Sequence, residues 1–246
     1  MNIAVILAGG KGTRVGSEIP KQFIKVYGKP ILVYTIEIFQ QHSEIDAIEI
    51  VCIEQYMDYM KEIIKEYKLT KVKWVVQGGK DFQHSVLNGV ANLKQECREE
   101  DTVLIHFGAS PFVKDYIISD AIRVCAKRGN AISTTPFYLL SGIKEDNVKS
   151  TKWIDRDTVA CMNSPHAFKY GVIKRIYEEA EERGIIEQVE PHTTTLMYML
   201  EKPIYFSKGS QSNIKITTKE DIELFEGYVL RQKRDGYKNG KNNCYI

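Results

Sequence analysis

The chain has 246 residues and a formal net charge of +2, from 34 Lys and Arg against 32 Asp and Glu, which gives no general electrostatic basis for binding nucleic acid or an anionic membrane. Hydrophobic residues make up 43% of the chain, as in an ordinary globular protein, and no stretch approaches the roughly 18 apolar residues of a membrane span. The five cysteines are scattered without a CxxC pair, so the composition disfavours a disulfide framework and a zinc site and fits a reducing, cytoplasmic compartment.

Short β-branched runs alternate with amphipathic stretches through the first half of the chain. The pattern predicts strands at 2–7, 47–52, 72–76 and 102–106, and helices at 31–40, 57–67, 84–93 and 117–127. Strand and helix that take turns at this spacing indicate right-handed crossovers. We therefore predict a doubly wound α/β fold, with a mostly parallel sheet and helices on both faces.

The alternation breaks between residues 135 and 162. Residues 138–154 are polar, charged and poor in helix formers, which predicts a projecting arm or hairpin at about 138–162. Regular structure resumes with predicted helices at 168–183 and 193–201, a strand at 204–207 and a closing helix from 219 to about 231. We expect a single domain over residues 1–232 and a polar, frayed tail over 233–246.

A glycine-rich turn follows the first strand, in the segment LAGGKGTRVGSEIPKQF at residues 7–23. Because glycine has no Cβ, backbone N–H groups of such a turn can approach phosphate oxygens closely. Arg14 and Lys21 add positive charge that can hold charge developing on an α-phosphate as pyrophosphate departs. The glycine spacing matches neither the Walker P-loop nor the dinucleotide fingerprint. A tight turn with two solvated surface cations is the alternative that the local pattern leaves open.

The whole segment resembles the signature of sugar-nucleotide-type nucleotidyltransferases, and PKQF indicates the cytidylyltransferases that act on methylerythritol 4-phosphate or ribitol 5-phosphate. The resemblance runs from residue 2 to about 231, through GGKDFQHSVLNG (78–89), VLIHFGASPFV (103–113), IDRDTVACMNSPHAF (154–168) and SNIKITTKEDI (212–222). It implies transfer of CMP from CTP to an alditol or sugar phosphate with release of pyrophosphate. It also implies Mg²⁺ carried by CTP, and a homodimer formed through the arm.

The resemblance further implies a role for each residue that matches the family motifs. The backbone of Ala8, Gly9 and Gly10 would contact cytosine and ribose, Gly79 would lie beside the base, and Ser85 would contact the nucleotide. The phosphates would be held by Gly12, Thr13 and Arg14, with Lys215 as a second cation nearby, and Lys21 would stabilise the α-phosphate in the transition state. Arg156 would bind the acceptor's phosphate in its own or the neighbouring subunit's site. The alternatives are a helix N-cap for Ser85 and a solvated surface charge for Arg156 and Lys215.

The chain also departs from the family pattern around the same site. Where family members usually read HDAARP, residues 106–111 read HFGASP, so Phe107 stands in place of the carboxylate expected to bind Mg²⁺ and no metal ligand can be assigned. Phe82 replaces an arginine, SGIK replaces DTIK in the arm, and Thr194 lies near a common aspartate. Two interpretations follow. One is a working transferase with Mg²⁺ on the triphosphate, and the other is a catalytically degenerate relative that binds a nucleotide without transferring it.

Overall fold

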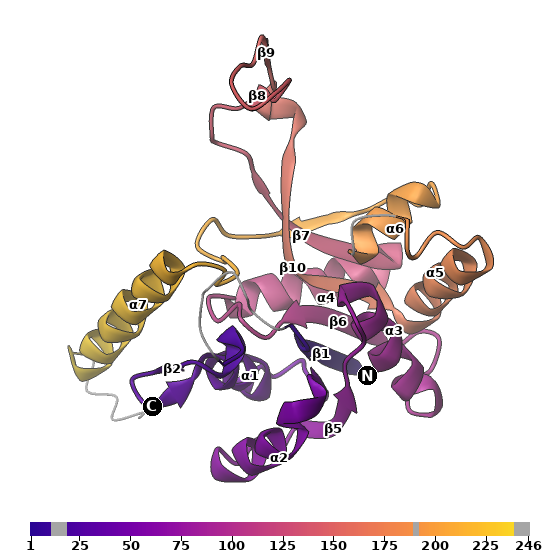
Figure 1. The fold of residues 1–246 in the computed structure, drawn as a ribbon. Coiled ribbons are helices and arrows are strands. Elements are labelled where there is room, and N and C mark those ends of the chain that lie inside the picture. The colour runs from indigo at the N-terminus through magenta and orange to yellow at the C-terminus, as the bar shows by residue number, and fades with distance from the viewer. Residues whose placement is uncertain (11–18, 189–191, 239–246) are drawn as a thin grey trace.

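The computed structural model describes residues 1–10, 19–188 and 192–238. These residues build a seven-stranded sheet in the order β11-β7-β10-β6-β1-β4-β5 (Figure 1). Its strands are β1 (Asn2–Ala8), β4 (Ala47–Cys52), β5 (Val72–Gln77), β6 (Thr102–Phe107), β7 (Asn130–Pro136), β10 (Ala160–Lys169) and β11 (Phe206–Lys208). Strand β10 runs antiparallel to β6 and β7, and the other neighbouring pairs of this sheet are parallel.

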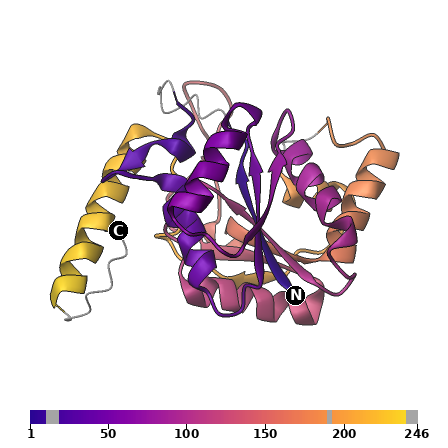
Figure 2. The same cartoon turned by 90° about the horizontal axis from the view of Figure 1, so that it is seen from below.

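Helices cover both faces of the sheet, as Figure 2 shows from below. One face carries α1 (Ile31–Gln41), α2 (Met57–Glu66) and α4 (Asp115–Arg128), and the other carries α3 (Phe82–Asn92), α5 (Tyr170–Glu182) and α6 (Thr193–Met199). In β1, Ala4 and Ile6 join the first core and Ile3 and Val5 the second, because successive side chains of a strand point to opposite faces. The prediction of a doubly wound, mostly parallel α/β fold is confirmed.

Two features of the main sheet differ from the expected pattern. Strands β7 and β10 were not expected, and the helix expected to start at residue 168 begins at Tyr170, because Phe168 and Lys169 belong to β10. Residues 164–168 are all buried between β6 and β7, so this segment lacks the alternation that marks a strand with one solvent-facing side.

The predicted arm projects from the body between β7 and β10 (Figure 1). A two-stranded hairpin of β8 (Gly142–Ile143) and β9 (Lys152–Trp153) lies near its tip. Large apolar side chains on the arm remain open to solvent, with Leu140 93% and Trp153 75% exposed. Within one subunit the arm therefore leaves apolar surface uncovered.

The closing helix α7 (Lys219–Lys238) continues past residue 231, so residues 233–238 are helical rather than part of a frayed tail. Its Phe225 and Val229 pack in a third apolar cluster with Val26 and Ile31, beside the short hairpin of β2 (Lys25–Val26) and β3 (Lys29–Pro30). The rest of the predicted tail, residues 239–246, lies outside the described residues. Among the helices that the structure describes, none has the length and apolar character needed to cross a membrane.

Candidate active site

A pocket of about 690 Å³ opens at the carboxyl ends of the central strands. Strand β1 lies between β4 and β6, so the strand order reverses at this point, and ligands of open α/β sheets bind at such a position. Six of the predicted site residues line the pocket, namely Gly9, Gly10, Lys21, Gly79, Ser85 and Lys215. Ala8 is 1% exposed within the end of β1, and Gly12, Thr13 and Arg14 lie outside the described residues.

The turn after β1 is held by a buried glutamine. Gln22 lies in the 3₁₀ turn Lys21–Phe23 and is 3% exposed. Its Nε2 donates hydrogen bonds to the carbonyl oxygens of Ala8, at 2.8 Å, and Gly10, at 2.9 Å. The neighbouring Lys21 is only 9% exposed and lines the pocket, so the alternative of a solvated surface cation is wrong for this residue. Sequence reasoning missed Gln22, although it lies in the PKQF motif.

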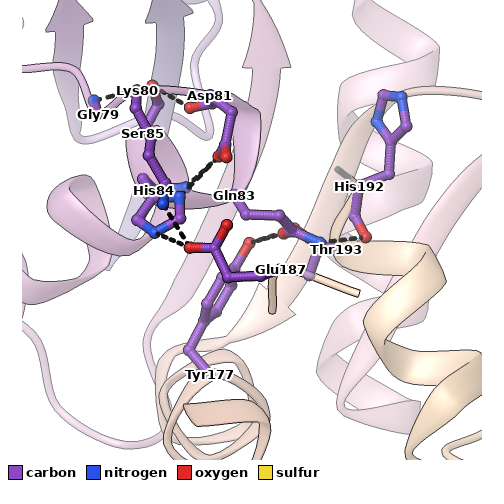
Figure 3. Close-up of polar contacts among 10 residues, drawn as sticks. All are labelled: Gly79, Lys80, Asp81, Gln83, His84, Ser85, Tyr177, Glu187, His192 and Thr193. Atoms are coloured by element: carbon purple, nitrogen blue, oxygen red, sulfur yellow. Dashed lines mark hydrogen bonds and ion pairs between the residues drawn. The ribbon is translucent and has the colours of Figure 1, made fainter. Parts of the chain in front are cut away.

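The turn between β5 and α3 forms the opposite wall. Ser85 Oγ donates a hydrogen bond to the carbonyl oxygen of Asp81 at 2.7 Å and accepts one from the backbone N–H of Gly79 at 3.1 Å (Figure 3). A Cβ on Gly79 would lie 2.3 Å from the Cβ of His84, so only glycine fits. The N-cap of α3 is Asp81, whose side chain accepts from His84 N at 2.9 Å, and the alternative of Ser85 as the N-cap is therefore wrong.

An aromatic cluster forms the third side of the pocket. The rings of Phe82 and Phe107 are 5.6 Å apart, and both residues line the pocket. His192 lies 4.8 Å from Phe82 and 6.3 Å from Phe107. Lys215 places its Nζ 3.9 Å from the centre of the Phe107 ring. The two departures from the family pattern at Phe82 and Phe107 therefore contact each other, and two rings pack together where the family has charged side chains.

A buried hydrogen-bond network adjoins this cluster at His192 (Figure 3). Gln83, which is fully buried, accepts a hydrogen bond from Tyr177 Oη at 2.8 Å and donates one to the carbonyl oxygen of His192 at 2.9 Å. Tyr177 Oη also lies 2.9 Å from Thr193 Oγ1. Burial raises the pKa of Tyr177, so the hydroxyl keeps its proton. The network ties the start of α3 to α5 and to the start of α6.

The described residues provide no cluster of side chains that could hold a magnesium ion by themselves. Among the described residues, the carboxylates on the pocket lining are those of Glu54 and Asp81. The Asp81 side chain already caps α3 and lies 2.8 Å from His84 Nδ1. No group of three or more His, Cys, Asp and Glu side chains is placed to hold a metal within the described part of the chain. Mg²⁺ prefers carboxylate and phosphate oxygens. Position 107, occupied by phenylalanine, supplies neither.

Arg156 does not line the pocket of its own subunit. It lies in the 3₁₀ turn Arg156–Thr158 on the arm, where it is exposed and its Nη1 donates to the carbonyl oxygen of Tyr138 at 3.2 Å. Its predicted contact with the acceptor phosphate, in its own or the neighbouring subunit's site, stays a prediction.

Comparison with known proteins identifies relatives along the whole fold. The 2-C-methyl-D-erythritol 4-phosphate cytidylyltransferase (IspD) family matches residues 2–231. Ribitol-5-phosphate cytidylyltransferase of Lacticaseibacillus paracasei is 42% identical over 95% of this chain and 99% of the relative, and 2-C-methyl-D-erythritol 4-phosphate cytidylyltransferase of Clostridium acetobutylicum is 40% identical over 92% and 96%. The crystal structure of 4-diphosphocytidyl-2C-methyl-D-erythritol synthase from Anaerococcus prevotii is 26% identical, covers 94% of this chain and 96% of that chain, and has a TM-score of 0.79. The resemblance predicted from the motifs is confirmed, and the chain belongs to the IspD family of cytidylyltransferases.

Proposed function

We propose that this cytidylyltransferase transfers CMP from CTP to ribitol 5-phosphate or a closely related alditol phosphate and releases pyrophosphate. The observation that carries the proposal is the pocket itself, which brings the glycine turn, Lys21 and Lys215 together at the carboxyl ends of the central strands. Relatives named for ribitol 5-phosphate and for methylerythritol 4-phosphate reach similar identities, 42% and 40%. We favour the ribitol compound because the SGIK and HFGASP segments depart from the family pattern.

The pocket supports this reaction mainly through position and charge. An oxygen of the acceptor's phosphate attacks the α-phosphorus of CTP, a new P–O bond forms, and the bond from the α-phosphorus to the oxygen bridging to the β-phosphate breaks. Negative charge grows on the departing pyrophosphate and can be stabilised by cations of the same pocket. Among the described residues, the cations that line it are Lys21, Lys80 and Lys215. Nucleotidyl transfer requires little covalent chemistry from the protein, so such an arrangement can suffice.

The proposal includes Mg²⁺ bound to the triphosphate of CTP. Mg²⁺ dehydrates reluctantly and is commonly bound through substrate phosphates with several waters. Since the described residues offer no carboxylate cage, we expect the ion to enter with CTP.

Cytoplasmic location also stays a prediction, which the free thiols of Cys52, Cys97, Cys125 and Cys161 support.

The homodimer is proposed from the surface of the arm. Leu139, Leu140, Trp153 and Arg156 lie around a hollow of about 450 Å³ on the arm. A second copy of the chain would cover these apolar side chains through a two-fold contact, in which the same surface meets itself. That arrangement would also allow Arg156 to reach the acceptor site of the partner.

One observation favours the degenerate relative as a second candidate. Phe82 and Phe107 fill part of the pocket with apolar rings, at positions where the family carries charge. A binder that has lost catalysis would keep the glycine turn for CTP and tolerate such a change.

A pyrophosphate-release screen separates the two candidates. Each of the four nucleoside triphosphates is tested with ribitol 5-phosphate, methylerythritol 4-phosphate and a panel of other alditol and sugar phosphates, with Mg²⁺ present. The transferase releases pyrophosphate with CTP and an alditol phosphate, and Lys21→Ala abolishes the release. The degenerate binder shows CTP binding by calorimetry and no release with any acceptor.

A further inference from the structure

The contact between Lys215 and Phe107 links a charged residue of the pocket to its aromatic wall. The ammonium lies 3.9 Å from the ring centre, well within the distance at which a ring face attracts a cation. We infer that Phe107 is a positioning residue, whose ring holds the Lys215 ammonium at the pocket wall where it binds phosphate. The inference rests on the proposed function for the identity of the pocket, and it concerns how that pocket binds phosphate.

The Phe107 ring is itself fixed by other rings. Its contacts with His166, at 6.2 Å, and His192, at 6.3 Å, are both edge-on, and Phe82 is tilted against it at 5.6 Å. Such edge-to-face arrangements are favourable because the ring edge is positive and its face negative. Burial lowers the pKa of His166 to about 3, so this imidazole stays neutral and adds no charge that would repel the ammonium.

The buried network shown in Figure 3 anchors the cluster at His192. Gln83 binds the carbonyl oxygen of His192 at 2.9 Å, and Tyr177 joins Gln83 to Thr193. The backbone at His192 is therefore tied to α3 and α5, which limits the movement of the imidazole beside Phe82 and Phe107. A sequence of contacts thus runs from three buried polar side chains through the rings to Lys215.

A ring and a carboxylate at position 107 would hold a lysine in chemically different ways. A carboxylate forms an ion pair, which cancels most of the field that the ammonium presents to a phosphate. A ring orients the ammonium through its quadrupole and adds no net charge of its own, so, unlike a carboxylate, it does not offset the charge that the ammonium presents to an incoming anion. Phe107 should accordingly strengthen the dependence of phosphate binding on Lys215.

The test is a double-mutant cycle with pyrophosphate as the probe, measured by calorimetry. The proteins are the wild type, Phe107→Leu, Lys215→Met and the double variant, with Phe107→Tyr as the control that keeps the ring face. We expect Phe107→Leu to weaken pyrophosphate binding about three- to tenfold and Phe107→Tyr to change it less than about twofold. In the Lys215→Met background, Phe107→Leu should have no further effect.

Three results would overturn the inference: an equal loss from Phe107→Leu in both backgrounds, no loss from that variant, or pyrophosphate binding that Lys215→Met leaves unchanged. Thermal unfolding verifies that each variant is folded, and Phe107→Met replaces Phe107→Leu if the latter does not fold. The cycle needs neither acceptor nor turnover. Failure of the proposed function would appear as absent pyrophosphate release in the screen, whereas failure of this inference would appear as one of these three results in the binding cycle.

Discussion

Gln22→Met removes the side-chain donor that holds the turn after β1 while keeping nearly the same volume. Gln22 Nε2 serves two backbone carbonyls, those of Ala8 and Gly10, and both hydrogen bonds are lost. The Ala8 oxygen keeps a longer hydrogen bond from the Ile53 N–H at 3.4 Å, so it is only partly unsatisfied. With about 1 kcal/mol for each bond and a further cost for a carbonyl left without a partner, we expect a loss of roughly 2–3 kcal/mol in the free energy of unfolding.

The same change should weaken CTP binding, because the turn at Gly10 would no longer be held in the form that meets the nucleotide. We expect a loss in affinity on the order of tenfold, equivalent to about 1.4 kcal/mol. Urea unfolding and calorimetry with CTP measure the two effects. Gln40→Met is the matched control, because Gln40 also makes two hydrogen bonds, to Thr70 and Lys71, on α1 away from the pocket. Wild-type CTP affinity in Gln22→Met would refute the reasoning.

Three further predictions address catalysis, pH and assembly. Lys21→Ala should lower kcat more than it weakens CTP binding, since its contact strengthens as charge develops, and steady-state kinetics with equal losses in both would contradict this. Burial raises the pKa of Glu49 to about 8 from an ordinary 4.5. Between these pH values the folded state keeps a proton that the unfolded state loses, so the free energy of unfolding should fall as the pH rises from 4.5 to 8, by at most about 1.4 kcal/mol per pH unit. Glu49→Gln should flatten that slope in urea unfolding at pH 5 to 8, and an unchanged slope would exclude Glu49 as its source. Trp153→Ser on the arm should shift the proposed dimer towards monomer by light scattering, and a monomeric wild type at micromolar concentration would exclude the dimer.

The central strands and helices could be predicted because local patterns carry them. Apolar runs such as that of β1 read as strands covered on both faces, and the alternation with helices implies parallel pairing. Strand β10 could not be found in this way, because its position depends on antiparallel pairing with β6 and β7, which are distant in the sequence. Because residues 164–168 of β10 are buried on both faces of the sheet, the strand also lacks the alternation of apolar and polar residues.

The site was predictable where motifs carry it and not where it depends on contacts between segments. Lys21, Gly79 and Lys215 come from matched motifs, and the fold brings them to one pocket. The hydrogen bonds of Gln22 and the contact of Phe82 with Phe107 join separate elements, and only the folded chain shows them. Two departures from the family pattern that look independent in the sequence are therefore a single local change.

Detection of the product tests the proposed transferase activity most directly. Wild-type protein is incubated with CTP, ribitol 5-phosphate and Mg²⁺, and the mixture is analysed by mass spectrometry for CDP-ribitol, with Lys21→Ala as the parallel sample. We expect CDP-ribitol from the wild type and a large loss of product with Lys21→Ala. Wild-type protein that binds CTP yet forms no CDP-linked product from ribitol 5-phosphate or any other alditol phosphate would contradict the proposed activity.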